Sequence, residues 1–248
     1  MFYSKYCASG NDFIITHSFL KYDRSDIAKK LCHRNYGIGA DGFIVLLPHH
    51  SCDMEWEFYN SDGSKADMCG NGTRASAMYG YDNGLCKDSL SLQTGAGKIE
   101  LSINGNIVKS ELSPYTIESQ TIEAYNRIWW KINTGVPHLV SFEDDIYALS
   151  KEELKALRHA HNANVNVGKL ENNILRIRTF ERGVEDETLA CGTGMAALFL
   201  RAYKEGSVQK SSKIIPSSGE ELTVECDNDR LFFEGKVQRV GSFVLELN

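Results

Sequence analysis

Short alternating runs of apolar and polar residues are more frequent in this chain than helical periodicity. Runs rich in aromatic and β-branched residues predict strands at 13–15, 43–47, 54–59, 128–132, 139–142, 174–180 and 243–247. Helical periodicity is clear at 25–34, where Ser25 is the expected N-cap, and at 151–161, where Ser150 and Glu153 form a capping-box pattern. Because strands and helices do not alternate regularly, an α+β fold is favoured over a doubly wound parallel sheet.

One motif occurs twice. Cys69-Gly70-Asn71-Gly72 and Cys191-Gly192-Thr193-Gly194 both read Cys-Gly-x-Gly, and each leads into an Ala-rich stretch with helical character. The two cysteines are 122 positions apart in a chain of 248 residues. The repeat indicates two similar halves, each with a helix that begins just after a cysteine.

A hairpin pattern recurs at the same offset. Gly97 and Gly219 each open an alternating strand, and turn residues follow at 104–105 and at 227–229. We therefore expect two domains, 1–118 carrying Cys69 and 119–248 carrying Cys191. The polar stretch around 114–126 is expected to connect them, and the last strand, about 238–248, is expected to pack on the N-terminal half.

Composition narrows the class of protein. A formal net charge of −6 disfavours a nucleic-acid or anionic-membrane partner. No apolar run approaches the roughly 18 residues of a membrane span, and the N-terminus lacks the apolar core of a signal peptide, so a cytoplasmic protein is expected. The seven cysteines are odd in number and show no C-x-x-C spacing, which favours free thiols over a disulfide framework.

A cysteine on a glycine-flanked turn before a helix faces free backbone N–H groups and the positive end of the helix dipole. Both favour the thiolate, and the same N–H groups can hold a carboxylate once glycines leave room for it. A tight turn with a small buried cysteine is the alternative for a single copy. Two symmetric copies favour catalysis, because inverting a carbon needs a base on one face and an acid on the other.

Polar side chains precede each cysteine. Asn60, Glu181 and Arg182 are of the types that recognise an amino acid's ammonium and carboxylate groups, although solvated loop residues would look the same. His138 stands alone beside an apolar strand, where a histidine is more often structural.

Taken together, these residues resemble the diaminopimelate epimerase family along almost the whole chain. The matching segments are 8–13, 37–42, 59–63, 68–74, 135–138, 164–166, 181–183 and 191–194. The order of the two Cys-Gly blocks, with Glu-Arg-Gly between them, is the specific part of the resemblance.

The resemblance implies two pseudo-symmetric strand-rich α+β domains, each a barrel-like sheet around a central helix, with the active site in the cleft between them. It implies interconversion of LL- and meso-diaminopimelate for lysine and peptidoglycan synthesis, with no cofactor and no metal. The expected partner is this small-molecule substrate, and the expected assembly is a homodimer.

The resemblance also assigns roles by position. Catalysis falls to Cys69 and Cys191, supported by His138 and Glu181, with Glu181 also at the substrate. The substrate-binding positions are Asn11, Asn60, Gly70, Asn71, Asn164, Arg182, Gly192 and Thr193. Asn166 is a less favoured candidate for the role given to Asn164, because the Asn-Val-Asn pattern aligns in two ways.

Three positions depart from the family pattern. Many members have Gln at the position of Gly42 and a substrate-binding Asn at the position of Val136, and the loop 181–191 is one residue longer here. The departures bear on contacts to the far end of the substrate.

Three other functions fit parts of the pattern. A relaxed-specificity or proline-racemase-like enzyme would share the paired cysteines. A redox-switched small-molecule-binding protein would use them as a disulfide, and would keep its ligand on reduction without turning it over. A Cys/His metal site is disfavoured by the absence of close ligand spacing.

Overall fold

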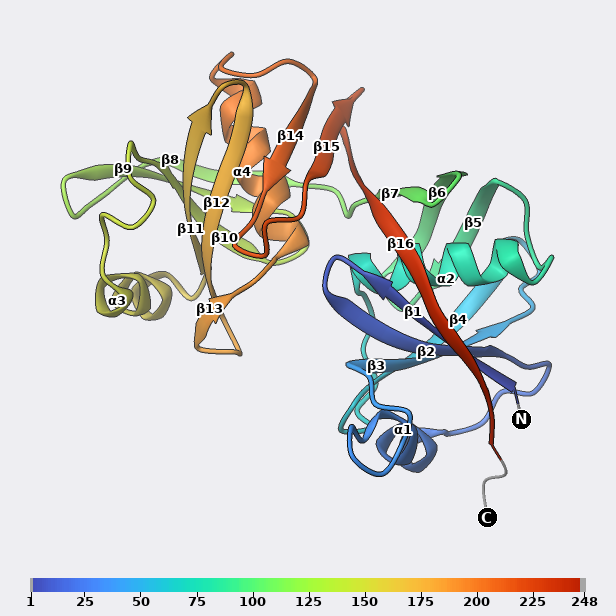
Figure 1. The fold of residues 1–248 in the computed structure, drawn as a ribbon. Coiled ribbons are helices and arrows are strands. Elements are labelled where there is room, and N and C mark those ends of the chain that lie inside the picture. Colours follow the sequence, from blue (N-terminus) through green and yellow to red (C-terminus); the bar gives the residue numbers. More distant parts are fainter. Residues whose placement is uncertain (1, 246–248) are drawn as a thin grey trace. The chain divides into compact units, whose positions relative to one another are not determined.

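A computed structural model describes residues 2–245, which fold into two compact units (Figure 1). Unit 1 comprises the chain up to Glu111 together with the chain from Gly235 onward, and unit 2 is Leu112–Glu234. The division expected at 118/119 falls inside a strand of unit 2, described below.

Unit 1 is a sheet that closes on itself. Its strands are β1 (Phe2–Ala8), β2 (Asn11–His17), β3 (Gly42–Leu47), β4 (Met54–Asn60), β5 (Ser89–Thr94), β6 (Gly97–Asn104), β7 (Ile107–Glu111) and the end of β16 (Arg230–Val244). They are hydrogen-bonded in that order, and β16 pairs with both β7 and β1. The two helices of the unit are α1 (Ser25–Cys32) and α2 (Gly70–Asp82).

Alternating side chains of β3 show how the sheet of unit 1 separates two cores. Ile44 and Leu46 pack against Ala75 and Met78 of α2, whereas Phe43, Val45 and Leu47 pack with residues of α1. Because successive strand residues point to opposite faces, β3 is buried along its whole length, with α2 on the inner face and α1 on the outer face.

Unit 2 also contains one sheet and two helices. Its strands are β8 (Thr116–Ala124), β9 (Arg127–Asn133), β10 (Pro137–Phe142), β11 (Asn164–Glu171), β12 (Ile174–Glu181), β13 (Asp186–Thr188), β14 (Ser211–Ile215), β15 (Leu222–Asp227) and the start of β16. The sheet order is β8-β9-β10-β11-β12-β14-β15-β16, and β13 pairs with β12. The helices are α3 (Lys151–His161) and α4 (Gly192–Lys204).

The two helices of unit 2 also lie on opposite faces of its sheet. Leu198 of α4 packs with Val140 and Ile177, whereas Leu154 and Leu157 of α3 share a separate core with the outward-facing residues of β11. The predicted strand-rich α+β class, with a helix at the centre of each half, is confirmed. No helix within residues 2–245 is long and apolar enough to cross a bilayer.

Of the two predicted helix N-caps, one is confirmed and one is wrong. Ser150 and Glu153 form the expected capping box of α3, with Glu153 N–H donating to Ser150 Oγ at 3.2 Å. Ser25, in contrast, is not an N-cap: Arg24 holds that position, and the Ser25 hydroxyl bonds Asp23 instead. The helix also ends at Cys32 rather than at 34.

The polar stretch expected to connect the halves is an edge strand. Residues Thr116–Ala124 form β8, which pairs with β9 and is largely exposed. Two register shifts, between Ile117 and Ser119 and between Ser119 and Ile122, break the period-two pattern that would have revealed it. The strand predicted at 243–247 is the end of β16 as far as Val244, and residues 246 and 247 lie outside the described residues.

Candidate active site

Each cysteine of the repeated motif is the N-cap of a 13-residue helix. Cys69 precedes α2 and Cys191 precedes α4, and both have extended backbone, with φ/ψ of −154°/113° and −129°/108°. The two helices begin and end at positions separated by the same 122 residues as the cysteines. The helices expected after the two motifs are therefore confirmed.

The Cys69 thiol contacts the first turn of α2. Its Sγ accepts a hydrogen bond from Gly72 N–H, at an N···S distance of 3.4 Å. Burial raises the pKa of the thiol, and the charge of Asp41 raises it slightly, while hydrogen bonds from the Gly72 and Asn71 amides and the charge of Arg74 lower it. Burial has the larger effect, so the thiolate stabilisation expected from the helix end is present but does not dominate.

The environment of the Cys191 thiol also disfavours the thiolate. It is buried, with Thr193 Oγ1 at 3.5 Å from Sγ. Burial, and after it the negative charge of Glu181, raises the pKa of Cys191 to about 11, against the hydrogen bond from Thr193. The two symmetric thiols therefore differ in their charged neighbours.

A chain of polar side chains ties the start of α2 to the first strands of unit 1. Asn71 Nδ2 donates to Asn11 Oδ1 at 2.6 Å, and Asn11 Nδ2 donates to Asp41 Oδ2 at 3.1 Å. Arg74 donates to Asn71 Oδ1 at 2.6 Å and to Ser9 Oγ at 2.7 Å. The structure thus brings Cys69, Asn71 and Asn11 together.

Arg74 is a residue of this site that the sequence analysis did not single out. Its side chain is fully buried in α2, and its counterpart in the repeat is Ala196 of α4. The signal was a charged residue inside an Ala-rich helix. Only the fold shows that its guanidinium fixes Asn71, whose backbone amide is one of the proposed carboxylate donors.

Gly42 and Asn60 are paired across β3 and β4. Asn60 is exposed, and its Nδ2 donates to Ser64 Oγ at 2.9 Å. A Cβ on Gly42 would lie 2.6 Å from Cε2 of Phe58 and 3.0 Å from the carbonyl oxygen of Tyr59. The side chain that many family members carry at this position therefore has no room here.

In unit 2, polar side chains replace the apolar core on the inner face of the sheet near the start of α4. His138 on β10 has the same strand parity as Val140, and Thr179 on β12 has the same parity as Ile177, so both face α4. Asn164 and Asn166 occupy the corresponding face of β11. All four side chains are buried.

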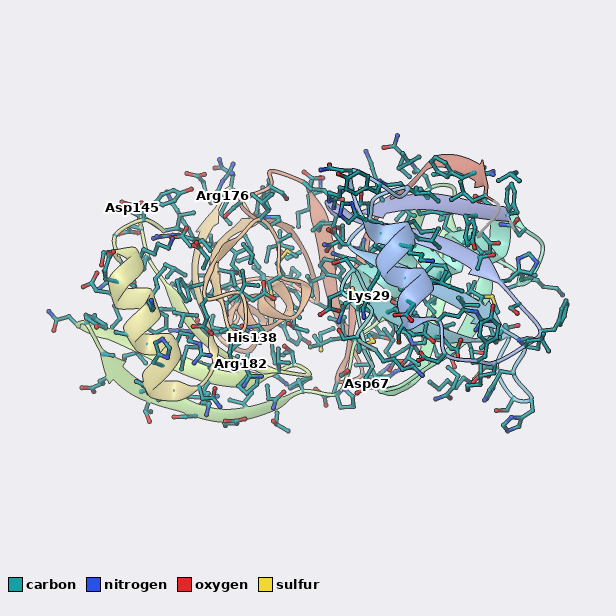
Figure 2. All side chains as sticks on the ribbon, turned by 90° about the horizontal axis from the view of Figure 1, so that it is seen from below. Lys29, Asp67, His138, Asp145, Arg176 and Arg182 are labelled. Atoms are coloured by element: carbon teal, nitrogen blue, oxygen red, sulfur yellow. The ribbon has the colours of Figure 1, made fainter. Side chains whose placement is uncertain are left out.

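His138 lies between the two asparagines. Asn166 Nδ2 is 3.0 Å from its Nδ1, and Asn164 Nδ2 is 3.5 Å from its Nε2. Burial and the positive charge of Arg182 lower the pKa of His138 to about 3, so the ring is neutral (Figure 2 labels both residues). His138 is therefore unsuited to holding a proton between catalytic steps.

Glu181 and Arg182 end β12 and begin the following turn. Thr188 Oγ1 donates to Glu181 Oε2 at 2.8 Å, and burial raises the pKa of the Glu181 carboxyl. The backbone N–H of Arg182 donates to Asn164 Oδ1 at 2.7 Å. The longer loop 181–191 forms a small hairpin, in which β13 pairs back on β12.

The glycines of the second motif have different roles. A Cβ on Gly192 would meet nothing within 4 Å, so the first N–H groups of α4 are approachable. A Cβ on Gly194 would collide with Oδ1 of Asn166, which means that this glycine serves close packing rather than ligand access. Thr134, also missed from sequence, donates its hydroxyl to the Thr193 carbonyl at 2.9 Å and fixes this turn.

The structure thus brings together the second set of expected residues, which lie around the start of α4 or at the adjoining ends of β10–β12. They are Cys191, Gly192, Thr193, His138, Asn164, Glu181 and Arg182.

Within residues 2–245, no group of three or more His, Cys, Asp or Glu side chains is arranged to hold a metal ion. All seven cysteines are free.

Comparison with known proteins identifies the family. The model of the family described as diaminopimelate epimerase matches residues 3–117 and 130–240. The chain belongs to the diaminopimelate epimerase family. A curated diaminopimelate epimerase of Nitratiruptor sp. is 55% identical over 239 residues, which are 95% of each chain. That of Helicobacter pylori is 43% identical and covers 99% of this chain and 97% of its own.

Solved structures from other families have a similar fold. A phenazine biosynthesis protein of the PhzF family from Enterococcus faecalis superimposes with a TM-score of 0.76 at 14% identity, covering 99% of each chain. A hydroxyproline epimerase from Agrobacterium vitis gives a TM-score of 0.64 at 13% identity, covering 98% of this chain and 91% of its own. At these identities the likeness concerns the fold alone.

Proposed function

We propose that this chain is a cytoplasmic diaminopimelate epimerase that interconverts LL- and meso-2,6-diaminopimelate for lysine and peptidoglycan synthesis, without pyridoxal phosphate or metal. Family membership and the curated relatives support the substrate and the reaction. The observation that carries the mechanism is the pair of cysteines, each capping a helix of equal length in its own unit.

In the proposed reaction, the two thiols serve opposite faces of one α-carbon. The thiolate of one cysteine removes the α-proton, and the electron pair of the broken C–H bond is delocalised into the substrate carboxylate. The thiol of the other cysteine then delivers its proton to the opposite face and becomes the thiolate. The two cysteines exchange roles for the reverse reaction.

The reacting carboxylate is proposed to bind the amides at Gly70-Asn71 and Gly192-Thr193. Helix N-termini favour a bound anion, and the open space around Gly192 supports access. Neutralising the carboxylate in this way also makes the α-proton easier to remove.

The remaining roles are proposed from the local geometry and the family resemblance. Asn11, Asn60, Asn164 and Arg182 hold the other polar groups of the substrate, and Glu181 lies near both the Cys191 thiol and the substrate. The expected homodimer is part of the proposal, and sedimentation of the purified protein tests it separately.

The proposal is tested by assaying the purified, reduced protein with LL-diaminopimelate, after exhaustive dialysis against a chelator. We expect formation of the meso isomer, and we expect no absorbance band of bound pyridoxal. A panel of other amino acids, proline included, distinguishes this activity from that of a relaxed-specificity racemase. Turnover that is lost with a metal and restored by it would contradict the proposed chemistry.

A further inference from the structure

Asn166 and His138 form a buried pair whose hydrogen-bond donors and acceptors can be assigned. Both side chains have 0% solvent exposure. They lie on neighbouring parallel strands, where Val140 of β10 is in register with Asn166 of β11. Because neither residue reaches water, every polar atom of the pair needs a partner within the protein or from a ligand.

The orientation of the Asn166 amide is fixed by Leu139 and Thr179. Its Nδ2 lies 3.0 Å from the carbonyl oxygen of Leu139, which can only accept a hydrogen bond. Its Oδ1 accepts from the Thr179 hydroxyl at 3.0 Å. The reversed amide would set two acceptor oxygens against each other at Leu139, so the nitrogen position is determined.

The Asn166 amide then determines where His138 carries its proton. The second N–H of Asn166 points at Nδ1 of the ring, at 3.0 Å, and only an unprotonated Nδ1 can accept it. The neutral ring must therefore carry its proton on Nε2. A doubly protonated ring would place two donors face to face in a buried site that also feels the charge of Arg182.

The Nε2 side of the ring has a donor for a neighbour. Asn164 Oδ1 accepts from the backbone N–H of Arg182 at 2.7 Å, so its NH₂ group is the one that faces Nε2, at 3.5 Å. Two donors cannot bond each other. Among residues 2–245, the Nε2–H group therefore finds no acceptor, and a buried donor without one is costly.

We propose that Asn166 is a positioning residue that holds His138 as the neutral Nε2–H tautomer, so that the ring is a fixed hydrogen-bond donor for a carboxylate bound at the start of α4. The location agrees with this role, because Cε1 of His138 lies 3.4 Å from the Cβ position of Gly194 in the first turn of that helix. The identity of the carboxylate as the substrate's rests on the proposed function. The tautomer does not, since it belongs to the ligand-free chain.

The tautomer is measured directly by two-bond ¹H–¹⁵N correlation of protein labelled at histidine nitrogens. We expect His138 to show an unprotonated Nδ1 and a protonated Nε2, unchanged from pH 8 to pH 5. The resonances of the other six histidines provide internal references in the same spectrum. A protonated Nδ1, or a His138 that becomes charged in this range, would overturn the proposal.

Two variants distinguish the effect of Asn166 on the tautomer from the effect of the hydrogen-bond network around it. Asn166→Asp replaces the donor by an acceptor of the same size, so the proton should move to Nδ1 and the pKa of His138 should rise. Thr179→Val removes one hydrogen bond from the same network but leaves the amide held by Leu139, so the tautomer should not change. If Asn166→Asp does not fold, Asn166→Ala should still lose the single Nε2–H signal. Equal changes in the Thr179→Val and Asn166 variants would overturn the assignment.

Kinetics and binding connect the tautomer to the reaction. We expect Asn166→Asp to lower kcat by about 10–100-fold, by analogy with the partners that orient metal-bound imidazoles, and Thr179→Val to lower it far less. In the Cys191→Ala variant, saturating LL-diaminopimelate should shift the Nε2–H proton resonance. Binding that leaves this resonance in place contradicts the inference, whereas a complete lack of binding contradicts the proposed function and leaves the tautomer result to decide the inference.

Discussion

The sulfur of Cys69 accepts a hydrogen bond from the backbone N–H of Gly72, three residues further along, at 3.4 Å. At Cys191, the symmetric counterpart, no cap hydrogen bond of this geometry forms, although the Gly194 and Thr193 amides also lower the pKa of the thiol, and the nearest charge is the carboxyl of Glu181, which raises it. A repeated sequence motif has therefore produced two thiols with the same backbone geometry and different electrostatics. The difference makes Cys69 the better candidate for the resting thiolate.

The difference predicts unequal rates of alkylation. In the ligand-free protein, Cys69 should react with iodoacetamide faster than Cys191 at pH 8, because the charge of Arg74 favours the Cys69 thiolate whereas the charge of Glu181 disfavours that of Cys191, whose pKa is raised to about 11. The rate at Cys191 should rise steadily as the pH approaches 11. Peptide mass spectrometry after timed alkylation measures both sites in one sample.

Glu181→Gln is the matched variant for this prediction. Removing the negative charge removes one cause that raises the pKa of Cys191, so its alkylation profile should move to lower pH. The profile of Cys69 should stay where it is, since Glu181 is not among the groups acting on that thiol. A shift at Cys69 of equal size would show that the substitution acts through the fold.

Gly42 predicts a cost in stability for any side chain at that position. In Gly42→Ala, the added Cβ would lie 2.6 Å from the buried ring of Phe58, so the ring or the strand must move. Overpacking of this kind costs about 1–3 kcal/mol, and Gly42→Gln should cost at least as much. Urea unfolding measures the loss.

Gly192→Ala is the control for that measurement. A Cβ there meets nothing within 4 Å, and the residue begins α4, where Ala is well tolerated. Its free energy of unfolding should be unchanged within about 0.5 kcal/mol. Equal losses in the Gly42 and Gly192 variants would mean that glycine flexibility, rather than the contact with Phe58, decides the stability at position 42.

Some features of the fold and of the site could be predicted from the sequence, and others could not. The cysteine motifs, the helices after them and the Ser150 cap were predictable because the deciding contacts are with neighbours in the chain. The environments of Arg74 and Asn166 were not. Arg74 depends on Ser9, which is 65 residues away in the sequence, and Asn166 depends on Thr179, which reaches it only through the register of β11 with β12.

The predictions for the edge strand β8 and for the Ser25 N-cap were wrong. The polar strand β8 is held by pairing with β9, and its register shifts remove the alternation that a sequence pattern needs. Ser25 has the right residue type for a cap, but its hydroxyl is taken by Asp23. The pairing of β8 with β9 is a contact that its own sequence does not show, whereas the Asp23–Ser25 hydrogen bond is local, and residue type alone did not reveal it.

Val136 predicts a weaker hold on the far end of the substrate than an Asn would give. The residue is only partly buried, and its carbonyl accepts from Thr134 N–H at 3.2 Å, so the backbone is already fixed. Val136→Asn should lower KM for diaminopimelate by about tenfold or more, since a hydrogen bond to a charged group contributes about 1.5–3 kcal/mol. Val136→Ile, which adds no polar group, should leave KM near that of the wild type. An unchanged KM in a folded Asn variant would mean that another residue already makes this contact.

The two-base mechanism makes the sharpest prediction, because each thiol is assigned to one face of the α-carbon. Cys69→Ala and Cys191→Ala should each abolish net epimerisation, since inversion needs a base and an opposed acid. In deuterated water, a variant that retains one thiol should still exchange the α-proton of the isomer whose proton faces that thiol, with retention of configuration. The other variant should favour the isomer of opposite configuration at that carbon.

Proton NMR of LL- and meso-diaminopimelate incubated with each variant measures exchange and inversion in the same tube. Cys226→Ala is a suitable control, because Cys226 is a buried thiol in the core of unit 2 and far along the chain from either motif. It should retain inversion at a rate near that of the wild type. Complementary exchange by the two catalytic variants would assign each thiol to its isomer. If either single variant inverts at close to the wild-type rate, one thiol is sufficient, the paired-cysteine mechanism is wrong and the repeat is structural.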